Sequence, residues 1–265
     1  MITIDKIDKY IDKIPPAPKA LKETLLQLKI GDLTKAALVA KEDKALNAYL
    51  TNLVNKPIYG FRNEVNDVSQ IFGILGVSKS QQAVYNYMMT LLSPSKWLLF
   101  TLNQSLFYSL QAELSINWQK ILTHLDIKDR EIGSAITLLP ASIIVSEALF
   151  CDNLEDVSLL RSVNDIDLNT IMKRLSGMDL FDICEKISQK WDMDEKIAQI
   201  IQASSGLKPS KDSELNELGK WMHLLLFFTL SKASYIDAQL NDFIDFQIDY
   251  VESIYNDFAQ LMEIS

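Results

Sequence analysis

The chain has 265 residues, of which 48% are hydrophobic, only 8 are Gly and 7 are Pro, and its formal net charge is −9 at pH 7. This composition supports a sizeable buried core and disfavours a turn-rich β architecture. The negative charge, without a Lys- or Arg-rich stripe, disfavours binding to nucleic acid or to an anionic membrane. We expect neither as a partner. The first residues lack a basic start and an apolar run, so no secretory signal is expected.

Leucine and isoleucine recur at three- and four-residue spacing along nearly the whole chain, which predicts an all-α protein. Gly31-Asp32 should end one helix and begin the next, with Asp32 as N-cap. Asp67 and Ser78 each begin a sequence that fits a capping box, and Gly76 between them fits a helix C-cap. After a stiff proline-rich entry at 14–18, the first helices are expected at 19–28, 44–55, 67–75, 79–92 and 96–113.

The second half of the chain continues this pattern, and its clearest loop runs from Gly206 to Ser213. The most apolar stretch, Trp221 to Leu230, has half of the roughly 20 residues that a membrane-spanning helix needs, so it should form a buried core helix. Helices are expected at 115–125, 128–138, 142–150, 154–162, 167–175, 179–190, 193–203, 213–232 and 235–262.

The last predicted helix, 235–262, is one-sided. One face carries an apolar stripe at three- and four-residue spacing, and another carries carboxylates. Such a helix can dock onto a partner or close its own core, and self-packing is the commoner fate. The apolar residues are Ile236, Leu240, Phe243, Ile244, Ile248, Val251, Ile254, Tyr255, Phe258, Leu261 and Met262, and the carboxylates are Asp242, Asp245, Asp249, Glu252 and Asp257.

Histidine and cysteine are too few and too scattered for a recognisable metal site. The two histidines, His124 and His223, lie far apart in the sequence, and neither is part of an HExxH motif or adjoins an Asp. Cys151 and Cys184 show no zinc spacing, so free thiols are expected. We predict no metal ligand and no cofactor-binding residue.

Acidic pairs such as Asp165/Asp167 and Asp192/Asp194 could serve acid–base chemistry. They fall at predicted helix starts, however, where Asp is expected as a cap. The sequence also contains no glycine-rich phosphate-binding loop. We therefore predict no catalytic residue.

Several segments of the first third resemble the HDOD domain family. They are Ile14 to Pro18, Glu42-Asp43, Leu53 to Gly60 and Gln70 to Gly76. That family shows a Leu-Pro-x-Leu-Pro entry, an acidic-Pro pair before a helix, and then Leu-Ala-Asn-Ser-Ala-x-Tyr-Gly and Ala-Ile-x-x-Leu-Gly segments. Order, spacing and residue types agree over about seventy positions.

The resemblance extends more faintly to the second half, where related HD phosphohydrolases carry His and Asp metal ligands. A His-Asp pair of those enzymes corresponds to Pro140 and Ala141 here, a later His to Leu180, and a His-His pair to Ser204-Ser205. With the neighbouring Leu139 these residues form the expected remnant of the cleft. We call them the relic positions: Leu139, Pro140, Ala141, Leu180, Ser204 and Ser205.

The resemblance implies an HDOD-type helical bundle, with an N-terminal helical subdomain (1–92) packed on a degenerate HD-like core (93–265). It implies a non-enzymatic bacterial signal-transduction protein of the cytoplasm that binds an unidentified signalling protein in trans, with a homodimer also open. Two alternatives remain. One is a small-molecule or nucleotide sensor that uses the relic cleft, and the other is a residual phosphohydrolase that relies on carboxylates such as Asp165 or Asp182.

Two surfaces are candidates for the interaction. One is the loop that contains Tyr59, Phe61 and Arg62, since aromatic and Arg side chains are typical of interface hot spots. Packing of the two aromatic rings inside the subdomain would equally explain that loop. The other surface is the acidic rim of the last predicted helix: Asp242, Asp245, Asp249 and Glu252.

Overall fold

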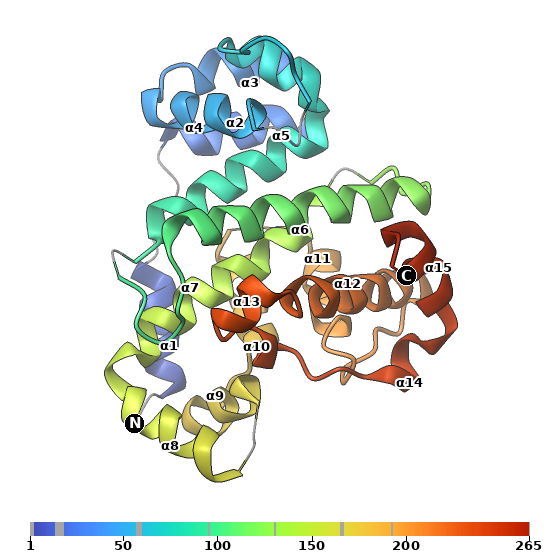
Figure 1. Cartoon of the computed structure of the whole chain (residues 1–265). Coiled ribbons are helices and arrows are strands. Elements are labelled where there is room, and N and C mark those ends of the chain that lie inside the picture. Colours follow the sequence, from blue (N-terminus) through green and yellow to red (C-terminus); the bar gives the residue numbers. More distant parts are fainter. Residues whose placement is uncertain are drawn as a thin grey trace. The chain divides into compact units, whose positions relative to one another are not determined.

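In the computed structural model, every regular element among the described residues is a helix (Figure 1). The described residues are 3–13, 19–56, 60–94, 96–129, 131–164, 167–191 and 193–264. The side chains of 13, 152, 161–164 and 242 are also left out. The all-α prediction is confirmed. The proline-rich entry at 14–18 lies outside the described residues.

The chain forms two compact units. The smaller unit comprises Pro15–Leu92 and Lys128–Ser134, and the larger unit comprises Met1–Ile14, Ser93–Ile127 and Ala135–Ser265. The division expected from the resemblance placed 1–92 in one subdomain and 93–265 in the other. It differs from these units in two places, because residues 1–14 group with the larger unit and 128–134 with the smaller one.

The smaller unit consists of helices whose starts are set by Asp side chains. Asp32 accepts a hydrogen bond from the Lys35 amide at 2.9 Å and begins α3, as predicted. Asp43 likewise accepts from the Ala45 and Leu46 amides and begins α4. The helices α2, α3 and α4 pack on α5. Their bounds are α2 Lys19–Lys29, α3 Leu33–Ala40, α4 Lys44–Val54 and α5 Val68–Leu92.

Helix α5 covers both of the helices expected at 67–75 and 79–92. Asp67 caps its start by accepting hydrogen bonds from the Ser69 and Gln70 amides. The expected break between the two helices is present as a kink, because Gly76 has a φ of 71°, which a residue with a side chain rarely adopts. The chain thus bends at the predicted position without leaving the helix for more than one residue.

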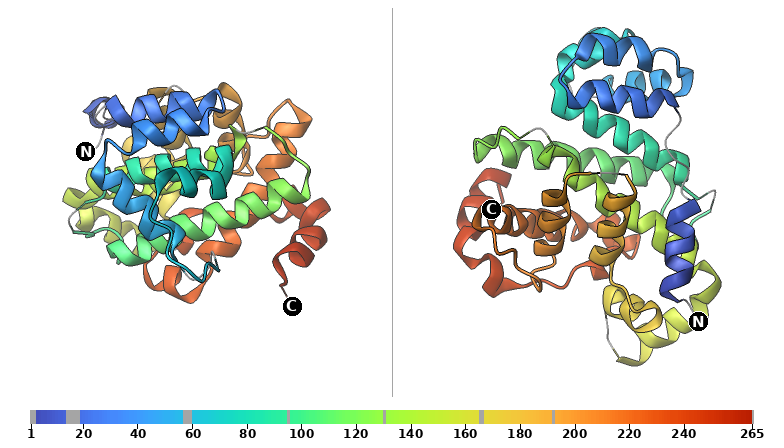
Figure 2. Two further views of the ribbon diagram at one scale, coloured as in Figure 1. Left: turned by 90° about the horizontal axis from the view of Figure 1, so that it is seen from above. Right: turned by 180° about the vertical axis from the view of Figure 1, so that it is seen from behind.

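The larger unit is built around α7 (Leu138–Phe150), which packs on α10 (Leu180–Lys190), α1 (Ile4–Lys13) and α6 (Gln104–His124). From α10 the packing continues through α11 (Glu195–Ala203) to α12 (Ser213–Leu230), which returns to α6 (Figure 2). The apolar stretch Ile132–Phe150, formed by the 3-10 helix η2 (Ile132–Thr137) and α7, is long enough to span a membrane, but it is 94% buried. It is therefore a core helix. The remaining helices are α8 Leu154–Asn164 and α9 Leu168–Ser176.

The helix expected at 96–113 does not form as predicted. Residues 96–103 are irregular, and α6 starts at Gln104 and runs through the region expected as a separate helix at 115–125. The cause is a buried carboxylate on α7. Glu147 accepts hydrogen bonds from the backbone amides of Leu98, Leu99 and Phe100, the last at 3.0 Å. Those amides consequently serve the carboxylate rather than a helix.

The single helix expected at 235–262 is also wrong. The segment is divided into α13 (Ala233–Asp237), α14 (Ile248–Val251) and α15 (Tyr255–Met262), joined by 3-10 turns and an extended stretch. Gln239 has a φ of 63°, which a continuous helix does not permit. Part of the apolar stripe nevertheless points inward, whereas Ile236, Ile248 and Tyr255 are exposed. Leu240, Phe243, Val251 and Phe258 are buried.

Candidate functional site

The relic positions all lie in the larger unit, and all six are buried. Leu139, Pro140 and Ala141 occupy the first turns of α7, where a proline is tolerated because its missing N–H would have no acceptor within the helix. Leu180 begins α10, which packs on α7. The Cys184 thiol of α10 donates to the Leu138 carbonyl at 3.4 Å. Hydrophobic core side chains thus occupy four of these positions, and the hydroxyls of Ser204 and Ser205 donate to backbone carbonyls of α11.

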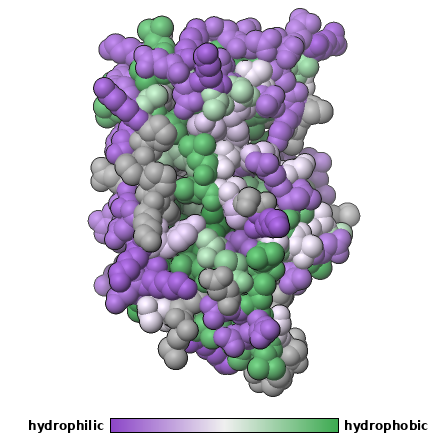
Figure 3. All heavy atoms as spheres, turned by 90° about the vertical axis from the view of Figure 1, so that its left-hand side faces the viewer, coloured by the Kyte–Doolittle hydropathy of each residue, from purple (hydrophilic) through white to green (hydrophobic). Residues whose placement is uncertain are grey.

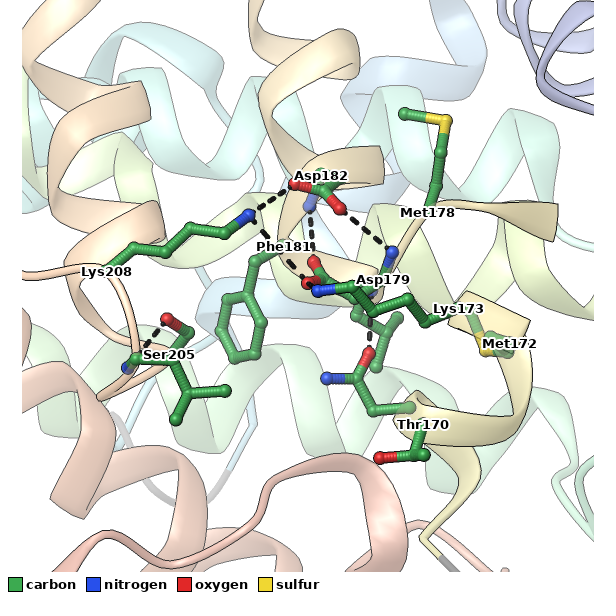
Figure 4. A network of polar contacts seen from close by, with 12 residues as sticks. Thr170, Met172, Lys173, Met178, Asp179, Phe181, Asp182, Ser205 and Lys208 are labelled. Carbon is green, nitrogen blue, oxygen red and sulfur yellow. Dashed lines mark hydrogen bonds and ion pairs between the residues drawn. The ribbon is translucent and has the colours of Figure 1, made fainter. Parts of the chain in front are cut away.

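Around the start of α10 lies a network of polar side chains, of which only Asp182 was a candidate from the sequence (Figure 4). Asp179 caps the helix by accepting from the Asp182 amide at 2.9 Å, and the Asp182 carboxylate accepts from the Asp179 amide at 3.0 Å. The ammonium of Lys173, on α9, lies 3.3 Å from the Asp179 carboxylate. The Lys208 ammonium lies 2.7 Å from Asp182 and 3.8 Å from Asp179.

The charges of this network compensate one another. Partial burial would raise the pKa of Asp182, but the hydrogen bonds from Lys208 and from the Asp179 amide lower it below the usual value. Burial would likewise lower the pKa of Lys208, and its carboxylate neighbours raise it above the usual value. Both groups therefore stay charged at neutral pH. The positive end of α10 is occupied by carboxylates of the same chain.

His223 is a structural part of the core. Its Nδ1 lies 2.9 Å from the Ser204 carbonyl, and the Gln247 amide donates to its Nε2 at 3.1 Å. The ring also stacks on Phe246, and it is fully buried. Burial lowers the pKa of His223. The neutral ring, protonated at Nδ1, satisfies both contacts and leaves no lone pair for a metal ion.

The other candidate ligands are not close together. His124 is exposed at the end of α6, beside the ring of Trp221. Burial raises the pKa of the Cys184 thiol to about 12, so it is inert, and Cys151 is a free thiol that donates to the Ala148 carbonyl. Within the described parts of the chain no three His, Cys, Asp or Glu side chains are arranged to hold a metal ion.

Of the acidic pairs singled out from the sequence, Asp165 and Asp192 lie outside the described residues. Asp167 caps α9 by accepting from the Thr170 amide, and Asp194 caps α11 by accepting from the Lys196 amide. The role expected for Asp at helix starts is confirmed for these two residues.

An open groove of about 530 Å³ lies beside the network, between α10, α11 and the loop after them. Gln202, one of its lining residues, donates through its side-chain amide to the Phe181 carbonyl and to the Glu185 carboxylate. The sequence pointed to the loop through Pro209 but gave no sign of a groove. Its lining residues are Glu185, Glu195, Ala198, Gln199, Gln202, Lys208, Pro209, Ser210, Lys211 and Asp212.

The predicted interaction residues are described only in part. Tyr59 lies outside the described residues, whereas Phe61 is 42% exposed and Arg62 is exposed beside it. Asp245, Asp249 and Glu252 are exposed on the larger unit, and the side chain of Asp242 is not described. Packing of the Phe61 ring in the interior is therefore not observed.

Comparison with known families gives a match to the HDOD domain over residues 14–206. The chain belongs to the HDOD family. This match covers most of the chain and includes both the segments and the relic positions on which the resemblance was based. The search of curated proteins finds no match.

Solved structures agree on the fold. An HDOD domain protein of unknown function from Geobacter sulfurreducens superposes with a TM-score of 0.65 at 13% identity, over 97% of this chain and 95% of that one. A candidate phosphohydrolase from Shewanella amazonensis SB2B superposes with a TM-score of 0.67 at 16% identity, over 97% of each chain. At such low identity these likenesses show a shared HDOD-like fold and leave the activity open.

Proposed function

We propose that this HDOD protein is a non-catalytic regulatory module of the bacterial cytoplasm that acts by binding another signalling protein. The observation that carries the proposal is what occupies the relic positions. Buried apolar side chains and Ser204-Ser205 stand at the positions that the resemblance assigns to the metal ligands of related enzymes, and they are part of the packed core. Restoring a metal centre there would require new ligands and an opened interior.

The state of the polar residues nearby supports the same proposal. The Asp179 and Asp182 carboxylates are committed to the start of α10 and to two lysines. His223 uses both ring nitrogens in contacts with backbone groups. A catalytic acid, base or ligand needs a free position toward a substrate, and each of these groups is already engaged.

The groove beside α10 favours a second candidate, a module that senses a small molecule. Its lining combines lysines, carboxylates and amides, which suits a polar ligand better than an apolar one. A thermal-shift screen of nucleotides and sugar phosphates tests it, since a ligand that binds only the folded state raises the melting temperature. This candidate would lose its support if no compound shifted the wild type more than a Gln202→Ala variant.

The leading proposal is tested by a metal and hydrolysis assay on the full chain. We expect substoichiometric metal after purification from Mn²⁺-, Fe²⁺- or Zn²⁺-supplemented cultures. We also expect no hydrolysis of bis-p-nitrophenyl phosphate or cyclic nucleotides above the buffer rate. Stoichiometric metal together with turnover would contradict the proposal.

A binding experiment supplies the positive half of that test. We expect cross-linking in the native host to capture a defined partner, and Phe61→Ala with Arg62→Ala to reduce its yield several-fold. The matched control is Glu155→Ala with Leu159→Ala, which removes one charged and one apolar exposed side chain from α8. Equal loss in both variants would mean that the loop at 60–62 is not the contact surface.

A further inference from the structure

The net charge of the chain is divided very unequally between its two units. The smaller unit carries 11 Lys and Arg against 8 Asp and Glu, a formal charge of +3. The larger unit carries 15 against 27, a formal charge of −12. The net charge of −9 is therefore the sum of two units whose net charges have opposite signs. Surfaces of opposite charge attract each other over roughly a Debye length.

The positive charge of the smaller unit includes a stripe along α2. Lys19, Lys22, Leu26, Lys29 and Ile30 recur at three- and four-residue spacing, which places them on one side of a helix. All five are exposed, Leu26 by 52% and Ile30 by 66%. We call this surface the α2 stripe. The lysines are three or more residues apart, so they form no continuous basic run in the sequence and come together only on the helix surface.

The buried side of the same helix explains why the stripe faces outward. Leu21, Thr24 and Leu28 are fully buried, and they follow the complementary spacing. The helix is therefore anchored by one face, and the α2 stripe faces outward. Within the smaller unit, Lys29 of the stripe forms an exposed ion pair with Glu131 at 3.3 Å, so the charge that the stripe offers to a partner rests on Lys19 and Lys22. Figure 3 shows one face of the molecule, on which hydrophobic and hydrophilic side chains are interspersed.

The larger unit has a surface of the opposite character at its C-terminal end. Ile248, Asp249, Glu252 and Tyr255 are exposed, Ile248 by 64% and Tyr255 by 47%. We call this surface the C-terminal stripe. Val251, Ile254 and Phe258, which alternate with these residues along α14 and α15, are buried and anchor the segment. Like the α2 stripe, it sets two large apolar side chains among charges of one sign.

We propose that two copies of this chain associate through these surfaces, the α2 stripe of one copy on the C-terminal stripe of the other. The charges are complementary, and each stripe offers two exposed apolar side chains to be covered. Because the two surfaces differ, a single contact is heterologous. A second, reciprocal contact closes a twofold dimer and doubles the buried area. This inference does not depend on the proposed function, which stands whether or not the chain self-associates.

Such an interface is small, polar at its rim and sensitive to salt. We expect a weak dimer, populated at a protein concentration of about 100 µM, as is typical of transient contacts. Its dissociation constant should rise about tenfold between low and high salt, because exposed ion pairs are screened. Sedimentation velocity over a concentration series at two salt concentrations measures both properties.

Charge reversal tests the pairing itself. One variant carries Lys19→Glu and Lys22→Glu, and the other carries Asp249→Lys and Glu252→Lys. All four side chains are exposed, so both variants should fold. We expect each variant alone to be monomeric, because its two stripes then have the same sign. Mixed in equal amounts, the two should form a heterodimer, since each reversed stripe then meets its complement.

Matched controls reverse the same number of charges at exposed positions outside the stripes. They are Lys44→Glu with Lys79→Glu on the smaller unit, and Glu155→Lys with Glu214→Lys on the larger one. Both controls should dimerise as the wild type does. A monomeric wild type at every concentration, or a dimer that survives both reversals, would overturn the proposal. So would variants that stay monomeric when mixed, or an α2 reversal that only releases a different bound protein or nucleic acid.

Discussion

Two buried carboxylates of the larger unit, Glu147 and Asp179, stabilise the fold by different means. Glu147 accepts hydrogen bonds from three consecutive backbone amides, and no cation is bound to it in the described part of the structure. Asp179 accepts from one amide and lies near two lysines that are themselves exposed. The first contact relies on main-chain geometry, and the second relies on charge that solvent can reach.

The Glu147 contact should stabilise the fold more than the Asp179 contact does. The amides held by Glu147 are partly or wholly buried, and they lose their only observed acceptors if the carboxylate is removed. The lysines beside Asp179 can turn to water instead, since their side chains are 54% and 44% exposed.

The largest effect is expected for Glu147→Ala. Removing the carboxylate leaves three backbone amides without acceptors, and the free energy of unfolding should fall by about 3 kcal/mol. Urea denaturation measures the loss, and hydrogen exchange at Leu98, Leu99 and Phe100 should accelerate. Glu147→Gln keeps one acceptor oxygen and should lose less. Equal losses in the two variants would mean that the charge and both acceptor oxygens are needed, because Gln keeps the packing of Glu, and a small loss in Glu147→Ala would contradict the importance of these hydrogen bonds.

A smaller effect is expected for Asp179→Ala. This change removes the cap of α10 and the partner of Lys173, and the free energy of unfolding should fall by about 2 kcal/mol. Asp179→Asn keeps the cap but not the charge, so it separates the two contributions. If Asp179→Asn were as destabilising as Asp179→Ala, the ion pairs with the lysines would contribute more to stability than the helix cap. The view that these exposed lysines can turn to water, which sets Asp179 apart from Glu147, would then be wrong. Thermal or urea unfolding of the three proteins decides this.

The smallest effect is expected for acid titration of His223. Burial lowers the pKa of this residue in the folded state, so the unfolded state binds a proton more readily. Stability should be complete above the ordinary histidine pKa, about 6.5, and should decline as the pH falls below it. His223→Asn should flatten this decline in urea denaturation between pH 7.5 and 5. His124→Asn, at an exposed position, should leave it in place.

Most helices could be predicted because their signals are local. Apolar spacing located them, and Asp32, Asp67, Asp167 and Asp194 marked their starts through contacts within three residues. The helices expected at 96–113, 128–138 and 235–262 do not form as predicted, and in the second of these segments residues 132–137 form a 3-10 helix. Long-range contacts are made in the other two segments, since Glu147 lies almost fifty residues from the amides it holds and His223 lies 24 residues from Gln247. No window of neighbouring residues contains either contact.

The candidate site, too, has parts that the sequence allows one to predict and parts that it does not. Two histidines are too few for a conventional His-rich metal centre, and this could be counted in the sequence. The polar network at α10 was missed although Asp179 and Asp182 stand at capping-box spacing, which is a local signal. Lys208 of this network could not have been placed from the sequence, because it reaches α10 only through the path of the loop that follows α11.

The contact of Glu147 with the backbone has a consequence for how the amino-acid sequence should vary among members of this family. Main-chain amides are common to all residues but proline, so the contact constrains position 147 without selecting the side chain at 98, which is 58% exposed. In an alignment, position 147 should stay acidic while 98 drifts, and proline should be absent from 98 to 100. Methods that search for pairs of positions changing together would overlook this contact, since only one of its partners is recognised by its side chain.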